Sequence, residues 1–366
     1  MGYRDELDTP ALVVHEDILK RNLAGMAEYA REKGIALRPH FKTHKTAEVV
    51  KMQQELGAIG ITCAKLGEVE ALVEAGVGDD FFIANEIIGP RKTKRLVALM
   101  ERVKLRVAVD SIDGAQGLQE AMAEAGKTLD VVIELNTGQN RAGMLPEQAL
   151  PLAEQVREKM PNLRVVGLMT HEGHAGKTLS QADLTAVATD AGNKMVNTAE
   201  QLREHGFDIT TVSVGSTPAA FETTQVEGVT EMRPGTYVFQ DNTIFRFGKL
   251  GPDNCALRIL ATVTSRPAPD RAVLDSGSKV LTIEPSQWQE GHGYVVEYPD
   301  ARIVSLSEEH AVLRLPESAQ SMQIGEKVEI IPNHVCPTVN LTDELYLVRD
   351  GEVAETWPVI ARGRVR

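Results

Sequence analysis

The stretch from Val131 to Thr170, VVIELNTGQNRAGMLPEQALPLAEQVREKMPNLRVVGLMT, holds two short apolar runs separated by an amphipathic segment. The runs Val131–Asn136 and Val165–Thr170 have the length and composition of buried strands, and Glu147–Lys159 has helical periodicity. A strand, a helix and a second strand in this order predict a right-handed βαβ unit within a parallel sheet.

The same alternation continues on both sides of this unit, from about residue 10 to about residue 245. Eight strand-type runs occur: Ile35–Arg38, Ile59–Cys63, Asp80–Ala84, Leu105–Val109, Val131–Asn136, Val165–Thr170, Val212–Gly215 and Val229–Arg233. Helical segments between them include Ala47–Leu56, Leu66–Ala75, Arg91–Arg102, Gly117–Ala125, Glu147–Lys159 and Ala182–His205. Alternation alone also fits an open, doubly wound sheet. The count of eight runs favours an α/β fold of the closed (β/α)8, TIM-type barrel class.

The pattern changes after about residue 250, where segments become short and rich in β-forming residues. They are Leu257–Thr264, Ala272–Asp275, Tyr294–Tyr298, Ile303–Leu306, Ala311–Leu315 and Lys327–Ile331. Two further segments, Glu344–Val348 and Glu352–Pro358, flank Asp350-Gly351, which is a hairpin signal. We therefore expect a barrel domain over residues 10–248 and a C-terminal all-β domain over residues 249–366, with residues 1–9 packing against the second domain.

Composition limits the partners and the compartment. The chain has 366 residues, enough for one large and one smaller domain. Its formal net charge of −13 argues against nucleic acid or an anionic membrane as a partner, and it has no apolar window long enough to span a bilayer. The N-terminus has no signal-peptide core. Three cysteines are too few for a disulfide framework, so we expect a reducing, cytoplasmic location.

Candidate site residues follow the predicted strands, at the end where such barrels place their chemistry. Gly215, Ser216 and Thr217 follow the seventh run, and Gly235 and Tyr237 follow the eighth. Barrels often bind a phosphate group after these two strands, because glycines let backbone N–H groups approach the anion and hydroxyls add donors. Two ordinary turns are the alternative. Their occurrence together favours a phosphate-binding cup.

Lys42 follows the first run, within His40-Phe41-Lys42-Thr43-His44-Lys45. A lysine at the mouth of a barrel can form a Schiff base with a carbonyl compound. The alternative is a basic loop exposed to solvent. A Schiff-base lysine and a phosphate cup in one barrel mouth point to pyridoxal 5′-phosphate as cofactor.

Arg141, His171 and His174 follow the fifth and sixth runs. Arg141 is a candidate to face the pyridine nitrogen of such a cofactor, where it would keep that nitrogen unprotonated. A salt-bridged arginine is the alternative. Either histidine is a candidate general base, because imidazole titrates near neutral pH, and a structural histidine is the alternative for each.

His334 and Cys336 lie two residues apart, after an apolar run that ends at Ile331. If that run continues as a strand, alternation puts both side chains on one face. An imidazole and a thiol suit a borderline-soft divalent cation such as zinc. Two ligands are too few for a closed structural site, so the pair predicts an open metal site completed by water or substrate. A buried cysteine beside a structural histidine is the alternative.

Motifs along almost the whole chain resemble those of D-threonine aldolases and eukaryotic-type D-serine dehydratases, which are alanine-racemase-like (fold type III) pyridoxal phosphate enzymes. The motifs are Leu7-Asp8-Thr9-Pro10-Ala11-Leu12, Arg38-Pro39-His40-Phe41-Lys42-Thr43-His44-Lys45, Asn140-Arg141-Ala142-Gly143, His171, Gly215-Ser216-Thr217, Arg233-Pro234-Gly235 and the pair His334/Cys336. The resemblance implies that Lys42, not Lys45, is the Schiff-base lysine. It also implies a divalent metal (Zn²⁺, Mn²⁺ or Mg²⁺) at His334 and Cys336 that engages the substrate β-hydroxyl, and a homodimer.

The activity implied by the resemblance is that of a lyase acting on a small D-3-hydroxy amino acid. A D-threonine aldolase, giving glycine and an aldehyde, is the first expectation. A D-serine or D-3-hydroxyaspartate dehydratase, giving a 2-oxo acid and ammonia, is the alternative, because dehydratases of the family pair the terminal histidine with cysteine. An amino-acid racemase is less favoured, since no tyrosine stands out as a second base. A non-catalytic cofactor-binding barrel protein would lack residues 250–366.

Overall fold

The computed structural model describes residues 2–248, 250–286 and 290–366. Residue 1 and residue 249, at the predicted domain boundary, lie outside the described residues. The chain packs into two compact units. The barrel unit comprises Met26–Lys42, Val49–Gly235 and Arg364–Arg366, and the β unit comprises Met1–Gly25, Thr43–Glu48 and Thr236–Gly363.

The barrel unit is a closed sheet of eight parallel strands, as the eight apolar runs predict. The strands are β2 (Ala36–Leu37), β3 (Ile61–Cys63), β4 (Asp80–Glu86), β5 (Lys104–Val109), β6 (Leu129–Glu134), β7 (Leu163–Met169), β8 (Thr211–Val214) and β9 (Glu231–Met232). Their order in the sheet is β2-β9-β8-β7-β6-β5-β4-β3. A parallel bridge between His40 and Thr62 joins the first strand to the last and closes the barrel.

Apolar side chains explain why these runs form buried strands. Phe81, Phe82 and Ile83 in β4 have no exposed surface, and neither do Val131 and Val132 in β6. A continuous apolar run is expected when a parallel strand is covered on both faces.

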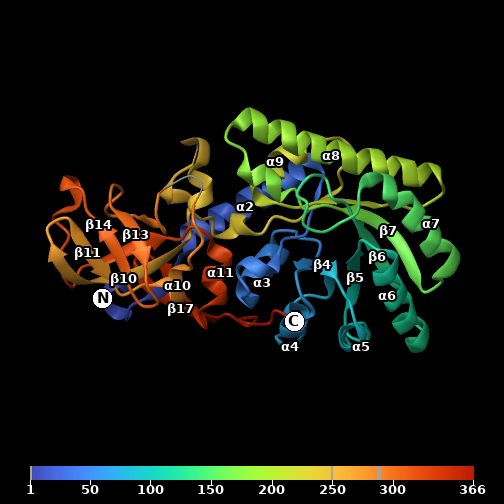
Figure 1. The fold of residues 1–366 in the computed structure, drawn as a ribbon. Coiled ribbons are helices and arrows are strands. Elements are labelled where there is room, and N and C mark those ends of the chain that lie inside the picture. The colour runs from blue at the N-terminus through green and yellow to red at the C-terminus, as the bar shows by residue number, and fades with distance from the viewer. Residues whose placement is uncertain (1, 249, 287–289) are drawn as a thin grey trace. The chain divides into compact units, whose positions relative to one another are not determined.

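Helices connect successive strands and lie along the outside of the sheet, as Figure 1 shows for α5 to α8. They are α3 (Ala47–Glu55), α4 (Leu66–Glu74), α5 (Pro90–Leu99), α6 (Ile112–Ala125), α7 (Ala149–Lys159), α8 (Gln181–Glu204) and the short α9 (Ala220–Thr223). All six predicted helical segments coincide with one of these helices. The sequence analysis missed α2 (Glu16–Lys33), which precedes β2. None of the helices in the described residues is long and apolar enough to cross a membrane.

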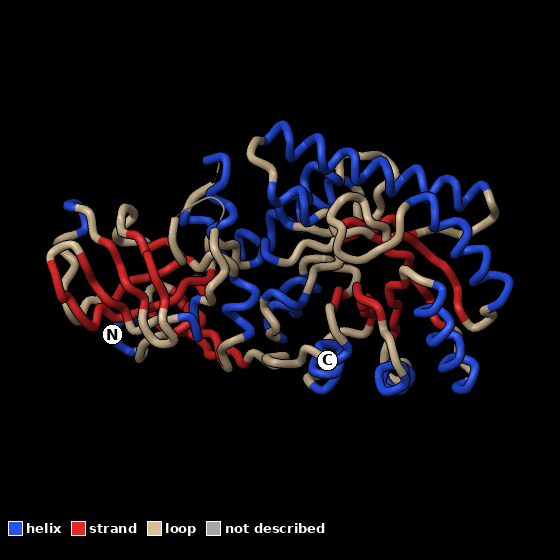
Figure 2. Tube along the Cα trace, in the orientation of Figure 1, coloured by secondary structure: helices blue, strands red, loops and turns tan. Residues whose placement is uncertain are grey.

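The β unit is built mainly of antiparallel strands, drawn in red on one side of Figure 2. They are β1 (Ala11–His15), β10 (Leu257–Ala268), β11 (Arg271–Leu274), β12 (Tyr294–Val295), β13 (Arg302–Leu306), β14 (Ala311–Arg314), β15 (Lys327–Ile331), β16 (Glu344–Arg349) and β17 (Glu352–Pro358). The main path runs β13-β14-β11-β10-β1-β16-β17, and β15 pairs with β10 and β12. The predicted hairpin is present, with positive φ at both Asp350 and Gly351. Three short helices complete the unit: α1 (Tyr3–Glu6), α10 (Ser278–Leu281) and α11 (Val335–Asn340).

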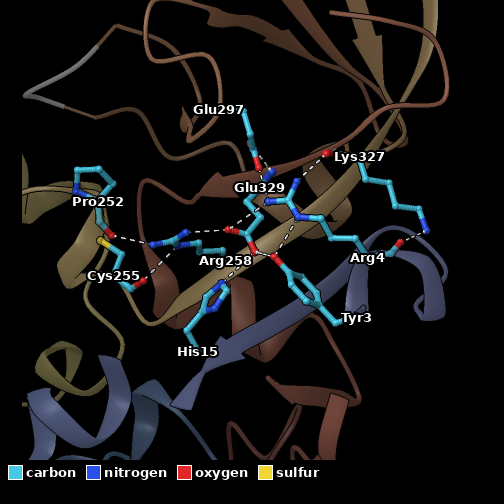
Figure 3. Close-up of polar contacts among 9 residues, drawn as sticks. All are labelled: Tyr3, Arg4, His15, Pro252, Cys255, Arg258, Glu297, Lys327 and Glu329. Carbon is cyan, nitrogen blue, oxygen red and sulfur yellow. Dashed lines mark hydrogen bonds and ion pairs between the residues drawn. The ribbon is translucent and has the colours of Figure 1, made fainter. Parts of the chain in front are cut away.

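Strand β1 is an element that the sequence analysis did not predict. It pairs antiparallel with β10 and parallel with β16, so the N-terminal segment lies within the β unit. Glu329 in β15 reinforces this arrangement (Figure 3). Its buried carboxylate accepts hydrogen bonds from the Tyr3 hydroxyl at 2.6 Å, His15 Nε2 at 2.9 Å and Arg258 Nη1 at 2.7 Å. Three donors satisfy a charge that would otherwise be costly to bury.

Candidate active site

The predicted cofactor residues of the barrel unit lie at the carboxyl ends of its strands. Lys42 lies in a 3₁₀ turn, Phe41–Thr43, that follows β2. Arg141 follows β6 and His171 follows β7. This is the end of a parallel barrel at which side chains from different strands converge.

The turn after β8 has the features of an anion cradle. The Ser216 hydroxyl is buried, and no group of the described residues is hydrogen-bonded to it. A Cβ atom at Gly215 would lie 2.8 Å from Arg233 Nη2, so a side chain there would push against a buried guanidinium. The backbone N–H of Gly235 donates to Thr217 Oγ1 at 3.2 Å and joins the turns after β8 and β9. An unsatisfied buried hydroxyl beside a glycine fits a phosphate ligand.

A carboxylate that the sequence analysis missed supports this turn. Glu172 is fully buried, and its Oε2 accepts a hydrogen bond from the Gly215 backbone N–H at 3.1 Å. Its Oε1 accepts from the Thr223 hydroxyl at 3.4 Å. Burial raises the pKa of Glu172. A glutamate two residues after the apolar run Val165–Thr170 was the available signal.

Hydrogen bonds link several buried charged and polar side chains of the barrel strands. Arg233 donates to Ser213 Oγ and to the Thr170 carbonyl, and the Ser213 hydroxyl donates to Glu231 at 2.6 Å. Arg38 donates to the same glutamate at 2.9 Å. The two arginines therefore hold strand ends together, and neither guanidinium lies in a solvated loop.

The structure separates the roles of the two lysines in the basic motif. Lys45 Nζ donates to Asn340 Oδ1 at 2.8 Å and to the Ala361 carbonyl at 3.2 Å, and the side chain is buried. Lys45 thus has a structural role within the β unit. Lys42 belongs to the barrel unit, and its positive charge acts on His171.

His171 has one tautomer that fits its surroundings. Its Nδ1 lies 2.5 Å from the Gly215 carbonyl oxygen, which can only accept, so Nδ1 carries the proton and Nε2 is the acceptor. Burial and the positive charges of Lys42 and Arg141 lower the pKa of His171 to about 3. The imidazole is therefore neutral at physiological pH. His174, the other candidate, has a buried Nδ1 that is hydrogen-bonded to no group of the described residues.

The loop that presents Arg141 is tightly folded. Asn136 Oδ1 accepts from the backbone N–H groups of Gly138 at 3.0 Å and Asn140 at 3.1 Å, and Asn140 has a φ of 55°. Gly143 has a φ of 90°, and a Cβ there would lie 2.8 Å from Asn136 N. These constraints direct Arg141 toward Glu134, with Nη2 3.6 Å from Oε1.

The predicted metal pair lies in the β unit, at the start of a helix. Strand β15 ends at Ile331, and His334 is the N-cap residue of α11, in which Cys336 lies. The expectation that strand alternation aligns these side chains is therefore wrong. His334 occupies the N-cap position without a capping hydrogen bond from its side chain, and Cys336 lies in the first turn of the helix.

Polar groups within the β unit surround the pair. The Cys336 thiol is 3.2 Å from the Thr43 hydroxyl, and His334 Nδ1 donates to Glu284 Oε2 at 2.6 Å. Asp241 Oδ2 accepts from the Val335 backbone N–H at 3.1 Å. Burial opposes protonation of His334, but Cys336, Asp241 and Glu284 raise its pKa to about 10. Sequence reasoning missed Asp241 and Glu284, because neither lies near the pair along the chain.

The donor set has the chemistry of an open divalent-metal site. An imidazole and a thiol are ligands for zinc or a similar cation, and a carboxylate on the other ring nitrogen is a common way to orient a metal-binding histidine. The described residues contain no group of three or more His, Cys, Asp or Glu side chains placed to hold a metal ion. Tyr237 also belongs to the β unit, where its side chain is buried.

Family models match both parts of the chain. Residues 14–243 match "Alanine racemase, N-terminal domain", and residues 256–348 match "Putative serine dehydratase domain".

Characterised relatives match over almost the whole chain. D-threonine aldolase from an Arthrobacter species is 36% identical over 362 residues, which cover 98% of this chain and 93% of the relative. D-threo-3-hydroxyaspartate dehydratase from Delftia sp. (strain HT23) is 31% identical over 371 residues, which cover 96% and 97%.

Solved structures agree with these relatives. Crystalline D-threonine aldolase from Filomicrobium marinum superposes with a TM-score of 0.91 at 36% identity, covering 100% of this chain and 99% of the other. Solved forms of the D-threo-3-hydroxyaspartate dehydratase include a histidine-to-alanine variant. They also include a metal-free form in which the cysteine two residues further on is replaced by alanine. The chain therefore belongs to the fold-type-III, alanine-racemase-like family of pyridoxal phosphate enzymes that includes D-threonine aldolase and D-threo-3-hydroxyaspartate dehydratase.

Proposed function

We propose that the chain is a pyridoxal-phosphate- and divalent-metal-dependent lyase of the D-threonine aldolase type, which cleaves a D-3-hydroxy amino acid to glycine and an aldehyde. The observation that carries the proposal is the hydrogen bond that fixes the tautomer of His171. Its Nδ1–H donates to the Gly215 carbonyl, which leaves Nε2 without a proton and able to accept one. The 36% identity to D-threonine aldolase over the whole chain supports this reaction.

Residues of the barrel unit would bind the cofactor. Lys42 Nζ would hold it covalently, and Gly215, Ser216, Thr217 and Gly235 would bind its phosphate. The unsatisfied Ser216 hydroxyl supports this assignment. Arg141 would face the pyridine nitrogen, and Tyr237 remains a predicted contact. When bound, pyridoxal phosphate withdraws electrons from the substrate Cα and so stabilises the carbanion that cleavage leaves there.

His334 and Cys336 would hold the metal, with Glu284 orienting the histidine ring. A bound divalent cation acts as a Lewis acid and makes the substrate hydroxyl easier to deprotonate. A histidine and a cysteine with the same spacing were varied in the related dehydratase, and the cysteine variant was solved in a metal-free form, which supports the assignment.

In the cleavage reaction, His171 would take the proton of the substrate hydroxyl as the Cα–Cβ bond breaks. The competing reaction is dehydration, which the 31% identity to D-threo-3-hydroxyaspartate dehydratase and the cysteine of the metal pair favour. In that case the Lys42 amine would remove the proton from Cα, and hydroxide would leave from Cβ.

A product assay decides between the two reactions. Protein supplied with pyridoxal phosphate and Mn²⁺ is incubated with D-threonine. We expect acetaldehyde and glycine. The appearance of 2-oxobutanoate and ammonia would make the chain a dehydratase. Neither pair of products from D-threonine, together with racemisation of alanine in a parallel incubation, would refute the lyase proposal.

The cofactor lysine is tested separately. Lys42→Ala should abolish the absorbance of the lysine-bound cofactor, whereas Lys45→Ala should retain it because Lys45 Nζ is held by Asn340 and Ala361. Absorbance that persists in Lys42→Ala would contradict the assignment. The homodimer, the cytoplasmic location and the domain limits 10–248 and 249–366 remain predictions.

A further inference from the structure

The sulfur atom of Cys336 has a hydroxyl group as its neighbour within the β unit. Thr43 Oγ1 lies 3.2 Å from Cys336 Sγ, which is within hydrogen-bond distance for sulfur. Both residues belong to the β unit, although 293 positions separate them along the chain. Thr43 is fully buried, whereas Cys336 is partly exposed. The contact therefore joins a buried hydroxyl to one member of the predicted metal pair.

A neutral thiol is a poor partner for a buried hydroxyl. Among the described residues, the contact with Cys336 is the single hydrogen bond of the Thr43 hydroxyl. The buried Thr198, by contrast, donates to the Lys194 carbonyl at 2.7 Å. A thiol is only a weak donor and a weak acceptor. With Cys336 as a neutral thiol, the Thr43 hydroxyl would therefore be poorly satisfied for a buried polar group.

A metal-bound sulfur is a better partner for this hydroxyl. Cysteine binds a divalent cation as the thiolate, which is negatively charged and carries no proton. A thiolate can only accept, so Thr43 would have to be the donor. Hydrogen bonds to a charged acceptor are about twice as strong as those between neutral groups. The position of the hydroxyl thus fits the state in which Cys336 holds a metal ion.

Other polar groups hold the rest of the pair in the same manner. Glu284 Oε2 accepts from His334 Nδ1 at 2.6 Å. Asp241 Oδ2 accepts from the Val335 backbone N–H at 3.1 Å. The histidine ring and the backbone between the two predicted ligands each have a partner, and Thr43 provides the corresponding partner for the sulfur.

We propose that Thr43 is a positioning residue of the metal site, which donates a hydrogen bond to the Cys336 thiolate and so fixes the direction of the sulfur lone pairs. This role rests on the metal site of the proposed function. Groups that hydrogen-bond to metal ligands orient them, and their removal typically lowers metal affinity by about 10- to 100-fold. A hydrogen bond to the sulfur also stabilises its electrons, which a spectroscopic probe can detect.

Substitution of the metal by cobalt tests this role without any need for activity. Full-length protein carrying pyridoxal phosphate is stripped of metal by a chelator and titrated with Co²⁺. The sulfur-to-cobalt charge-transfer band is recorded as a difference spectrum, which also gives the dissociation constant. Thr43→Val removes the hydroxyl at constant size, and Thr43→Ser and Thr43→Ala differ from each other only in the hydroxyl. Thr198→Val is the matched control, because it removes a buried hydroxyl in the barrel unit.

The band should have one wavelength in the wild type, Thr43→Ser and Thr198→Val. In Thr43→Val and Thr43→Ala we expect it to move to longer wavelength, because the sulfur electrons lose a stabilising donor. The dissociation constant for Co²⁺ should rise about tenfold in these two variants. An unchanged wavelength and dissociation constant in Thr43→Val would overturn the role of Thr43. If that variant does not fold, equal values in Thr43→Ser and Thr43→Ala would overturn it instead.

Two outcomes separate this role from the proposed function. The shifted band in Thr43→Val, in a protein whose wild type forms neither acetaldehyde nor 2-oxobutanoate from D-threonine, would refute the lyase and support the role of Thr43. A wild-type cobalt spectrum identical to that of Cys336→Ala would refute the metal site and the role of Thr43 together.

Discussion

Single residues of the barrel unit derive their chemistry from local contacts. His171 Nε2 is an acceptor because the single N–H of the neutral ring, at Nδ1, donates to the Gly215 carbonyl oxygen. The sequence predicts both His171 and His174 as candidates, and only the hydrogen-bond partner distinguishes them. Lys42 and Lys45 are also distinguished by their contacts. The Lys45 ammonium group donates to Asn340 Oδ1 and to the Ala361 carbonyl, which gives it a structural role.

Substitution of His171 by asparagine should lower kcat for D-threonine cleavage about 100-fold or more and leave KM nearly unchanged, because the proton acceptor is lost. The wild-type kcat should also show no histidine ionisation between pH 5 and pH 8. A pKa of about 3 means that the ring is neutral throughout that range and gains a proton only in more acidic solution.

The control is His205→Asn, at an exposed position in the same unit, where kcat should not change. An acid limb near pH 6.5 that disappears in His171→Asn would show that the ring is protonated in the active range. Such a result would contradict the lowered pKa, whereas an unchanged kcat in His171→Asn would contradict its role as the base.

At the scale of elements, the position of a polar side chain in a turn or at a helix cap determines whether it has a hydrogen-bond partner. Ser216 lies in the turn after β8 with an unsatisfied hydroxyl, whereas Ser180 caps α8 by accepting from the Asp183 N–H at 3.1 Å. The same side chain therefore has opposite roles in two turns of one unit.

Substitution of each serine by alanine should separate binding from stability. Ser216→Ala should raise the dissociation constant for pyridoxal phosphate about tenfold and should not lower the free energy of unfolding of the cofactor-free protein. Ser180→Ala should lower that free energy by about 1 kcal/mol and leave the dissociation constant unchanged. Urea denaturation and absorbance titration measure the two quantities. A large loss of stability in Ser216→Ala would mean that its hydroxyl has a structural partner.

The contact between the N-terminal segment and β15 depends on the negative charge of the Glu329 carboxylate. Burial would raise the pKa of Glu329, but hydrogen bonds from His15 and Tyr3 and the charge of Arg258 lower it to about 2. A lowered pKa means that the carboxylate stabilises the native state above its unfolded pKa of about 4.3, and that this contribution is lost as the pH falls toward 2.

Glu329→Gln should therefore lower the free energy of unfolding by about 3 kcal/mol at pH 7, because Arg258 is left buried without its counter-ion. The difference from the wild type should shrink between about pH 4 and pH 2. Denaturant titrations at several pH values measure it. Asp343→Asn, which removes an exposed partner of Arg362, is the control and should change little. A difference that does not depend on pH would contradict the role of the charge.

At the scale of the whole molecule, metal binding should increase the stability of the native state. A ligand that binds only the native state stabilises it by about 2.7 kcal/mol at 100 times its dissociation constant. Mn²⁺ added after chelation should therefore raise the unfolding temperature of the protein by about 5 °C. It should also restore the activity.

The variants His334→Ala and Cys336→Ala should not respond to Mn²⁺, and His310→Ala, at an exposed position of the β unit, should respond like the wild type. Calorimetry measures the shift without any need for activity. An equal response in Cys336→Ala would place the metal elsewhere.

The sequence by itself determined the architecture, because hydrophobic periodicity reports how each segment is buried. Eight apolar runs became eight barrel strands, and the short segments after residue 250 became the strands of the β unit. Order along the chain also placed Lys42, Arg141, His171 and Ser216 after strands. Strand β1 escaped prediction because a short run before a long helix gives no alternation to recognise.

Only the tertiary structure decided the states and partners of the polar groups. Arg38 and Glu231 are 193 residues apart, and no local pattern predicts that their side chains are hydrogen-bonded. The same is true of Glu284 and Asp241 beside His334. Protonation, tautomer and charge depend on burial and on neighbours brought together from distant strands, and this information is absent from periodicity.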